Sequence, residues 1–332
     1  MLATGKKTVT VLIGCCLLAC GLPESKDSSL PQKEPTLEEK VGTQIDGLDA
    51  KSALHAKHLP SGREIAIRAD EPMNSVSVIK IAIMVLAYRD AETKRLNLQE
   101  RYVLQPEDKR GGSGVLQSFE PGLRPTYRDL ITQMIITSDN TATDILVNKV
   151  SLSRVNDMLA ELGYEETRLQ GTLAARYRRR WEAFDPAFAA LSDREVFERG
   201  FPSDPASGER SFALNADPAE WLGRTTARET SRLLEQIHTG DLTSRPFSDE
   251  MIEILKKQRS NSRLPRRIRF QGAVVAHKTG DSPPSTANDV GIIYYEGGPT
   301  IVSVFTNENR GSFVELEETI GSIAQDLIAE WR

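Results

Sequence analysis

Cysteine is almost absent from this chain. Of 332 residues only three are cysteines, and all of them lie within the first twenty residues, at Cys15, Cys16 and Cys20. The rest of the chain therefore has no thiol for a disulfide, a thiolate metal cluster or redox chemistry. A basic surplus is also missing, because 42 Lys and Arg stand against 47 Asp and Glu, a net charge of -5. This balance argues against a nucleic-acid partner, which requires a surplus of basic side chains on one face.

The first forty residues have a composition unlike the rest. A basic patch precedes about a dozen apolar residues, too few to span a bilayer comfortably. Residues 17–21 (LLACG) resemble the end of a bacterial lipoprotein signal, so 1–19 is predicted to be a lipoprotein signal peptide and Cys20 its lipidated product terminus. An ordinary signal peptide that happens to end in cysteine is the alternative. Residues 20–40 are rich in Pro, Ser and charge, which indicates a disordered tether.

These features predict a protein exported by a bacterium. Its lipid anchor would hold it to a membrane that faces the periplasm or the cell exterior. The catalytic domain is expected to occupy the remaining residues, 41–332.

Hydrophobic periodicity in 41–332 predicts strands at both ends and helices between them. Strands are expected at 51–59, 63–69, 273–277, 289–295 and 300–305. Helices are expected at 76–89, 127–137, from 141 onward, and at 153–162, 226–238, 248–259 and 313–331. This order predicts an α/β fold of the α+β type, with one antiparallel sheet built from both termini, flanking helices and an inserted all-helical lobe.

We expect a cleft between the two predicted lobes, which is a usual place for a functional site. The sheet lobe is expected to contain 41–75 and 263–332, and the helical lobe 76–262. An enlarged loop segment at 170–222 is interrupted by four prolines and carries arginines beside aromatic residues. Such a cluster could bind phosphates or lipid headgroups, but interleaved acids favour a helix whose aromatics pack and whose arginines are solvated.

Three short motifs carry the chemistry. Ser77 and Lys80 are three residues apart at the start of an apolar helix, which places both side chains on one face. Ser138-Asp139-Asn140 lies between two helices, and Lys278-Thr279-Gly280 ends a predicted strand. Each motif alone has a structural explanation as a cap, a turn or a strand end. Together, and in this order, they resemble class A serine β-lactamases and penicillin-binding proteins.

The resemblance covers roughly residues 45–332 apart from 170–222. It includes the Thr-Arg-Leu sequence at 167–169, the Thr-Thr-Ala sequence at 225–227 and the strand at 288–293. It implies a serine β-lactamase-like hydrolase that hydrolyses the β-lactam amide. A penicillin-binding D-Ala-D-Ala peptidase-like protein, or an esterase, without efficient deacylation is the alternative. The implied substrate is a small β-lactam or a peptidoglycan-like molecule, and we expect a monomer without cofactor or metal.

The resemblance also assigns roles to the first group of residues. Ser77 is the acylated nucleophile, and Lys80 accepts its proton. Ser138 passes a proton to the leaving nitrogen, and Asn140 bonds the side-chain amide of the substrate. A lysine is a poor base at its reference pKa of about 10.4, but burial and the like charge of Lys278 would lower the pKa of Lys80.

The second group binds the substrate. By resemblance Lys278 and Thr279, followed by Gly280, hold the substrate carboxylate, and the backbone N–H groups of Ser77 and Asp281 form the oxyanion hole. His277 precedes this group and is expected to point away from the site, because side chains alternate along a strand. The four histidines lack metal-ligand spacing, so no zinc site is expected.

One expected residue is missing. Class A enzymes carry a glutamate four residues beyond the leucine of the Thr-Arg-Leu match, where it activates the water that releases the acyl group. Leu173 occupies that position here. Glu182 and Glu209, both in the enlarged segment, are the candidate replacements, and the sequence does not choose between them. We favour hydrolytic turnover over lasting acylation because the wider resemblance is to β-lactamases.

Overall fold

The computed structural model describes residues 8–10 and 34–332. The chain divides into two units, Met1–Pro35 and Thr36–Arg332. Cys20 and most of the predicted signal peptide and tether lie outside the described residues. Within the described part of the chain, no helix combines the length and the apolar character that crossing a membrane requires.

Thr36–Arg332 is built on a five-stranded sheet in which every neighbouring pair is antiparallel. Along the sheet the strands follow the order β2-β1-β8-β7-β6. Their bounds are β1 Lys51–His58, β2 Glu64–Ile67, β6 Val274–Ser282, β7 Thr286–Tyr294 and β8 Thr300–Asn307. The two ends of the unit therefore share one sheet, which confirms the predicted α+β architecture, and β6 lies at an edge.

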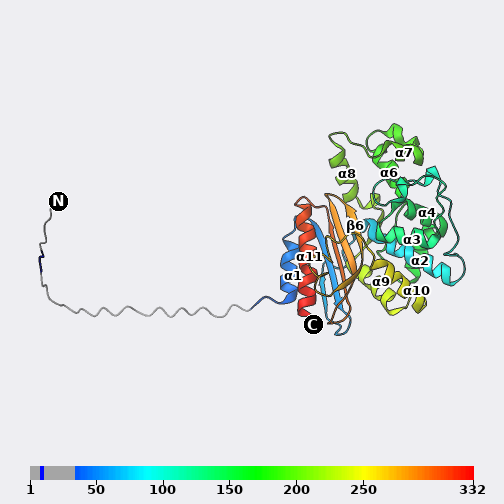
Figure 1. The fold of residues 1–332 in the computed structure, drawn as a ribbon. Helices are drawn as coiled ribbons and strands as arrows, with labels where there is room; N and C mark the ends of the chain where they lie inside the picture. Colours follow the sequence, from blue (N-terminus) through cyan, green and yellow to red (C-terminus); the bar gives the residue numbers. More distant parts are fainter. Residues whose placement is uncertain (1–7, 11–33) are drawn as a thin grey trace, which may run out of the picture. The chain divides into compact units, whose positions relative to one another are not determined.

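Helices cover both faces of this sheet (Figure 1). On one face lie α1 (Leu37–Asp46) and α11 (Phe313–Glu330), whose buried residues form an apolar layer with β1, β7 and β8. On the opposite face lie α9 (Ala227–Thr239) and α10 (Arg245–Leu255). Apolar side chains recur at helical spacing in α1 and α11, which explains why one side of each helix is buried.

The helical part packs around α2 (Lys80–Glu92), ten of whose residues are buried. A helix that is apolar on nearly every side belongs in the centre of a core. Its neighbours are α3 (Tyr127–Ile136), α4 (Asn140–Val150) and α5 (Leu152–Glu161). The short 3-10 helices are η1 Val76–Ile79, η2 Pro106–Asp108, η3 Leu116–Ser118, η4 Pro186–Ala190 and η5 Pro218–Glu220.

The segment predicted as an enlarged loop contains three helices. They are α6 (Leu173–Glu182), α7 (Asp193–Arg199) and α8 (Ser207–Ala216). The side chain of Thr172 caps α6, and Asp144 in α4 accepts hydrogen bonds from the N–H groups of Leu173 and Ala174, both at 2.8 Å. Arg110 donates to the same carboxylate at 2.7 Å, so the start of α6 is fixed to the helical core.

Several boundaries differ from the sequence predictions. The first helix begins at Leu37, inside the predicted tether, because Thr36 and Glu39 form a capping box and Val41 and Ile45 supply a buried face. Residue 77 lies in a 3-10 turn rather than in the following α-helix. Strand β6 extends to Ser282, so the Lys-Thr-Gly motif lies inside the strand.

A second, small sheet was not predicted. It consists of β3 (Met73–Asn74), β5 (Gly223–Thr225) and β4 (Arg168–Leu169), in that order. The strands are only two or three residues long, too short for any alternating pattern to identify them. Strand β3 precedes η1, β4 precedes α6 and β5 follows α8. The small sheet therefore joins the start of η1 to both ends of the α6–α8 segment.

Gly280 permits β6 to approach the turn that carries Ser77. A Cβ atom built on Gly280 would lie 2.6 Å from the carbonyl oxygen of Ser75. We predict that Gly280→Ala lowers the free energy of unfolding by about 1–3 kcal/mol, because the backbones must separate. Thermal or urea unfolding measures the loss. Gly42→Ala is the matched control, since nothing lies within 4 Å of its added Cβ. Equal stability of Gly280→Ala and the native chain would contradict this contact.

Candidate active site

Ser77 lines a cavity to which the helical part and strand β6 both contribute. The cavity has a volume of about 500 Å³, within the range of small-molecule sites. Ser77 is 8% exposed and is carried by η1, directly before α2. The other walls come from Asn140 in α4, from the cavity-facing side of α6 and from Asp281 at the end of β6.

Two lysines meet behind this cavity at the hydroxyl of Ser138. Lys80 Nζ donates to Ser138 Oγ at 3.2 Å and Lys278 Nζ donates to the same atom at 3.0 Å. Both lysines are fully buried. Lys80 Nζ also donates to the Ser138 carbonyl at 2.7 Å and to Asn140 Oδ1 at 2.9 Å. The structure thus brings Lys80, Ser138, Asn140 and Lys278 together, as their motifs imply.

The expected hydrogen bond between Lys80 Nζ and Ser77 Oγ is not formed. Among the described residues, the ammonium of Lys80 makes its hydrogen bonds to Ser138 and Asn140, and none reaches Ser77 Oγ. Both side chains are nonetheless buried within one turn of each other. A hydrogen bond that is long before substrate binds does not exclude proton transfer from Ser77, because catalytic contacts tighten in the complex.

Burial changes the pKa of both lysines. Removal from water lowers the pKa of Lys80 well below its usual value, and the nearby charge of Lys278 lowers it further. Burial lowers the pKa of Lys278 to about 8, although Asp281 and Asp289 act in the opposite direction. The charge of Lys278 is thus, after burial, a cause that favours the neutral form of Lys80.

Two residues beside the site have left-handed backbone. Val76 has φ 45° and Ser138 has φ 56°. Such a conformation costs about 1–3 kcal/mol in a residue other than glycine. At Val76 it is held by its N–H, which donates to Asn74 Oδ1 at 3.1 Å. Asn74 is in turn fixed to the sheet, since its carbonyl accepts from Asn288 at 2.9 Å and its N–H donates to Asn307 at 2.8 Å.

Asn140 is fully engaged by the protein. Its Oδ1 accepts from Lys80, while Nδ2 donates to the carbonyl of Gly111 at 2.9 Å and to Tyr177 Oη at 2.6 Å. An amide nitrogen has only two hydrogens. The role that resemblance gives Asn140, a bond to a substrate amide, therefore requires displacement of Gly111 or Tyr177. Burial raises the pKa of Tyr177 to about 12, so its hydroxyl stays protonated.

The remaining predicted binding residues follow one another along β6. Lys278 Nζ donates to the carbonyl of Thr279 at 2.7 Å, and Gly280 gives the close approach to η1. The carboxylate of Asp281 is paired with Arg263, which also contacts Glu317 at 3.3 Å. Of these residues, Lys278 bonds Ser138 and Asp281 lines the cavity with Ser77.

His277 lies outside the site. Its Nδ1 is 2.9 Å from Asp289 Oδ1, on the neighbouring strand β7. It precedes Lys278, whose ammonium reaches Ser138. The two side chains therefore have different surroundings, as strand alternation requires.

Neither candidate glutamate lies with Ser77. Glu182 is the last residue of α6 and is half-buried, and Glu209 is 78% exposed and contacts Arg310 at 3.4 Å. Neither lines the cavity of Ser77, whereas Leu173 does. The geometry therefore gives no support to Glu182 or Glu209 as the group that activates a water, because a base must be within hydrogen-bond reach of it.

Sequence reasoning missed the face that α6 presents to the site. Leu173, Arg176, Tyr177 and Arg180 all line the cavity. Their spacing of three, four and seven residues is that of one helical face. The sequence favoured a helix for this cluster but treated its arginines as solvated, whereas Arg176 and Arg180 line the cavity.

Comparisons with known proteins identify the family and the fold. The model of the Beta-lactamase enzyme family matches residues 36–331. A Beta-lactamase from Streptomyces fradiae is 22% identical, over 99% of this chain and 95% of that protein. The solved β-lactamase of Sphaerobacter thermophilus is 25% identical with a TM-score of 0.70, over 89% of this chain and 96% of that one.

Two other solved structures share the fold. An ancestral class A β-lactamase has a TM-score of 0.71 at 20% identity and covers 89% of this chain and 100% of its own. A mutant of PBP-A in which glutamate replaces a leucine, solved as an acyl-enzyme complex with penicillin G, has a TM-score of 0.66 at 20% identity. Its alignment covers 88% of this chain and 96% of that one.

The proximity of the lysines gives a testable result. We predict that Lys278→Gln raises the pKa of Lys80, because a like charge is removed from its surroundings. Lys278→Arg is the matched control, since arginine keeps the charge and the pKa of Lys80 stays low. NMR titration of isotope-labelled lysine side chains measures both. If the Lys80 midpoint is the same in Lys278→Gln as in the native chain, the two ammonium groups are not coupled.

Proposed function

Because the chain belongs to the Beta-lactamase enzyme family, we propose that it is a serine hydrolase that β-lactams acylate at Ser77 and that releases the acyl group slowly. The observation that carries the proposal is the meeting of Lys80 and Lys278 at Ser138 Oγ, behind a cavity that Ser77 lines. A nucleophile, a neutral base and a proton carrier are the parts that acyl transfer requires.

Acylation can be written from these contacts. Neutral Lys80 takes the proton of Ser77 as Oγ forms a bond to the β-lactam carbonyl carbon. The bond from that carbon to the ring nitrogen then breaks. Ser138 gives its hydroxyl proton to the nitrogen and is reprotonated by Lys80, to which it is 3.2 Å away. The proton taken from Ser77 thus ends on the leaving nitrogen, and no proton is gained or lost.

Lys278 has a separate role in this proposal. Its ammonium lies on the other side of Ser138 and is fully buried. A carboxylate on the substrate would supply the negative partner that this cation lacks nearby, apart from the more distant Asp281 and Asp289. A charge-assisted bond in a buried site is among the stronger polar contacts. Carboxylate-bearing β-lactams, or peptidoglycan-like acyl peptides, fit this requirement.

We expect slow release of the acyl group because the described lining of the cavity offers no unpaired carboxylate that could activate a water. Asp281 and Glu317 are the only carboxylates among its described lining residues, and Arg263 pairs with both. Leu173 occupies the position at which the sequence comparison expects a glutamate. The PBP-A mutant that was solved as an acyl-enzyme complex with penicillin G shows that a protein of the same fold can be acylated by this β-lactam. The expectation of slow release reverses the preference that the sequence alone suggested.

Rapid hydrolysis is the second candidate. It is favoured by the 22% identity with a Beta-lactamase from Streptomyces fradiae along 99% of this chain. The two candidates differ only in how quickly water removes the acyl group from Ser77.

Substitution of Leu173 distinguishes slow release of the acyl group from rapid hydrolysis. Leu173 is the first residue of α6 and is 4% exposed, so a glutamate there would lie at the cavity wall and near the positive end of a helix. We predict that Leu173→Glu speeds loss of a benzylpenicillin adduct by about tenfold or more, since a general base typically contributes at least this much. Intact mass against time measures the loss.

Leu173→Gln is the matched control, with the same shape and no carboxylate, and should keep the slow release. The proposal is wrong if the native chain turns over benzylpenicillin rapidly without an observable adduct. That result would favour hydrolytic turnover.

We also propose that the protein is exported and anchored by a lipid on Cys20. The support is the sequence of residues 17–21 and the polar segment after it. We predict that Cys20→Ser remains unprocessed or becomes soluble, because serine cannot take the thioether-linked lipid. Membrane fractionation with metabolic fatty-acid labelling checks this. Labelling and fractionation equal to those of the native chain would remove the assignment.

A further inference from the structure

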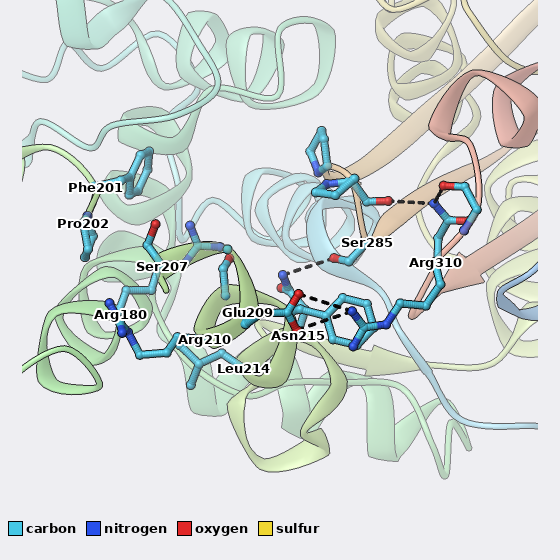
Figure 2. Close-up of a pocket in the computed structure, with 17 residues that line it drawn as sticks. Arg180, Phe201, Pro202, Ser207, Glu209, Arg210, Leu214, Asn215, Ser285 and Arg310 are labelled. Carbon is cyan, nitrogen blue, oxygen red and sulfur yellow. Dashed lines mark hydrogen bonds and ion pairs between the residues drawn. The ribbon is translucent and has the colours of Figure 1, made fainter. Parts of the chain in front are cut away.

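A second cavity adjoins the site. It has a volume of about 450 Å³ and lies between α8, the turn after β6 and the loop after β8 (Figure 2). Four residues line both cavities: Arg180, Phe201, Ser211 and Pro283. The two volumes therefore meet at a polar junction made by Arg180 of α6 and Ser211 of α8.

Arg180 differs from the other arginines of the second cavity. Arg210 is paired with Asp204, and Arg310 is 3.4 Å from Glu209. For Arg180 the described residues provide neither a hydrogen bond nor an ion pair. Its guanidinium instead lies 5.3 Å from the ring centre of Phe201 and 5.9 Å from that of Tyr177. The side chain is held by aromatic rings while its donors stay available.

Arginines also outnumber carboxylates in the lining of the catalytic cavity. Its arginines are Arg176, Arg180 and Arg263, but its carboxylates, those of Asp281 and Glu317, are both paired with Arg263. Arg176 bonds neutral oxygens, the carbonyl of Glu220 and Asn215 Oδ1. The charge of Glu220 also acts on Arg176, so Arg180 is the guanidinium on this face of α6 that faces the cavity without a carboxylate partner among the described residues.

The position of this face identifies the part of the substrate that it meets. Tyr177 lies between the two arginines in sequence, and its hydroxyl bonds Asn140. Lys278, which the proposed function gives to the ring carboxylate, bonds Ser138 Oγ rather than Tyr177 or Asn140. The α6 face therefore borders the side of the cavity next to Asn140, where the acyl side chain of the substrate would lie.

We propose that Arg180, with Ser211 beside it, forms a subsite for a carboxylate on the acyl side chain of the substrate. This deepens the proposed function and rests on it. The guanidinium offers a planar pair of donors that matches a carboxylate, and the hydroxyl of Ser211 can donate a third bond. The preferred substrates would then carry two carboxylates, one held by Lys278 and one by Arg180.

The test compares two penicillins that differ by one carboxylate. Benzylpenicillin and its α-carboxy analogue carbenicillin share every other group. Second-order acylation rates are measured by intact mass for the native chain, Arg180→Gln, Arg180→Lys and Arg194→Gln. Arg194 is an exposed arginine of α7 paired with Glu198, so it is the matched control for loss of a charge.

We predict that Arg180→Gln lowers the ratio of the carbenicillin rate to the benzylpenicillin rate by about tenfold, the effect of one charge-assisted hydrogen bond. Arg180→Lys should keep part of the ratio, and Arg194→Gln should leave both rates as in the native chain. An unchanged ratio in Arg180→Gln overturns the subsite and leaves the proposed function intact.

Calorimetry of ligand binding tests the Arg180 subsite even if no acylation occurs. Phenylmalonate should bind the native chain more tightly than phenylacetate, and this difference should disappear in Arg180→Gln. If benzylpenicillin forms no adduct, the proposed function fails, and the calorimetric difference alone decides the subsite. Equal binding of the two acids by the native chain contradicts it.

Discussion

Two buried ammonium groups that share one hydroxyl set the conditions for the whole site. Lys80 and Lys278 lie 3.2 and 3.0 Å from Ser138 Oγ, and both are closed off from water. Burial of two like charges side by side is costly unless one of them loses its proton. Burial and the charge of Lys278 therefore favour the neutral form of Lys80, which is the form that can act as a base.

The architecture holds these groups in place from three distant parts of the chain. Lys80 begins α2, Ser138 precedes α4, and Lys278 lies on the edge strand β6. Gly280 allows β6 to press against η1, and Asn74, Asn288 and Asn307 tie the entry to η1 to the sheet. The left-handed backbone of Val76 and Ser138 is maintained by this surrounding structure.

Much of this was accessible from the sequence, for physical reasons. The long helices and the strands of the main sheet show clear periodicity, and Ser77, Lys80, Ser138 and Lys278 stand in short motifs with fixed spacing. The contacts of α6 were not accessible. Its start depends on Asp144, 29 residues earlier, which accepts the N–H of Leu173. A tertiary contact of this kind leaves no local pattern.

The same limit explains the outcome for the glutamates. Glu182 was chosen for its local sequence, Arg-Trp-Glu, and Glu209 by counting back along the chain from Thr225. Neither criterion gives the direction of a side chain at the end of α6 or on α8. The structure turns Glu209 toward Arg310 and leaves Leu173 at the cavity wall. The enlarged segment therefore contributes arginines and a tyrosine to the site, rather than the expected acid.

In the proposed function, Ser77 is the residue that becomes acylated. The most direct measurement is peptide mapping by tandem mass spectrometry after brief exposure of the native chain to benzylpenicillin. We expect one penicilloyl group, on the peptide that contains Ser77, and none in Ser77→Ala. A penicilloyl group on another residue, or an equal adduct in Ser77→Ala, would contradict it.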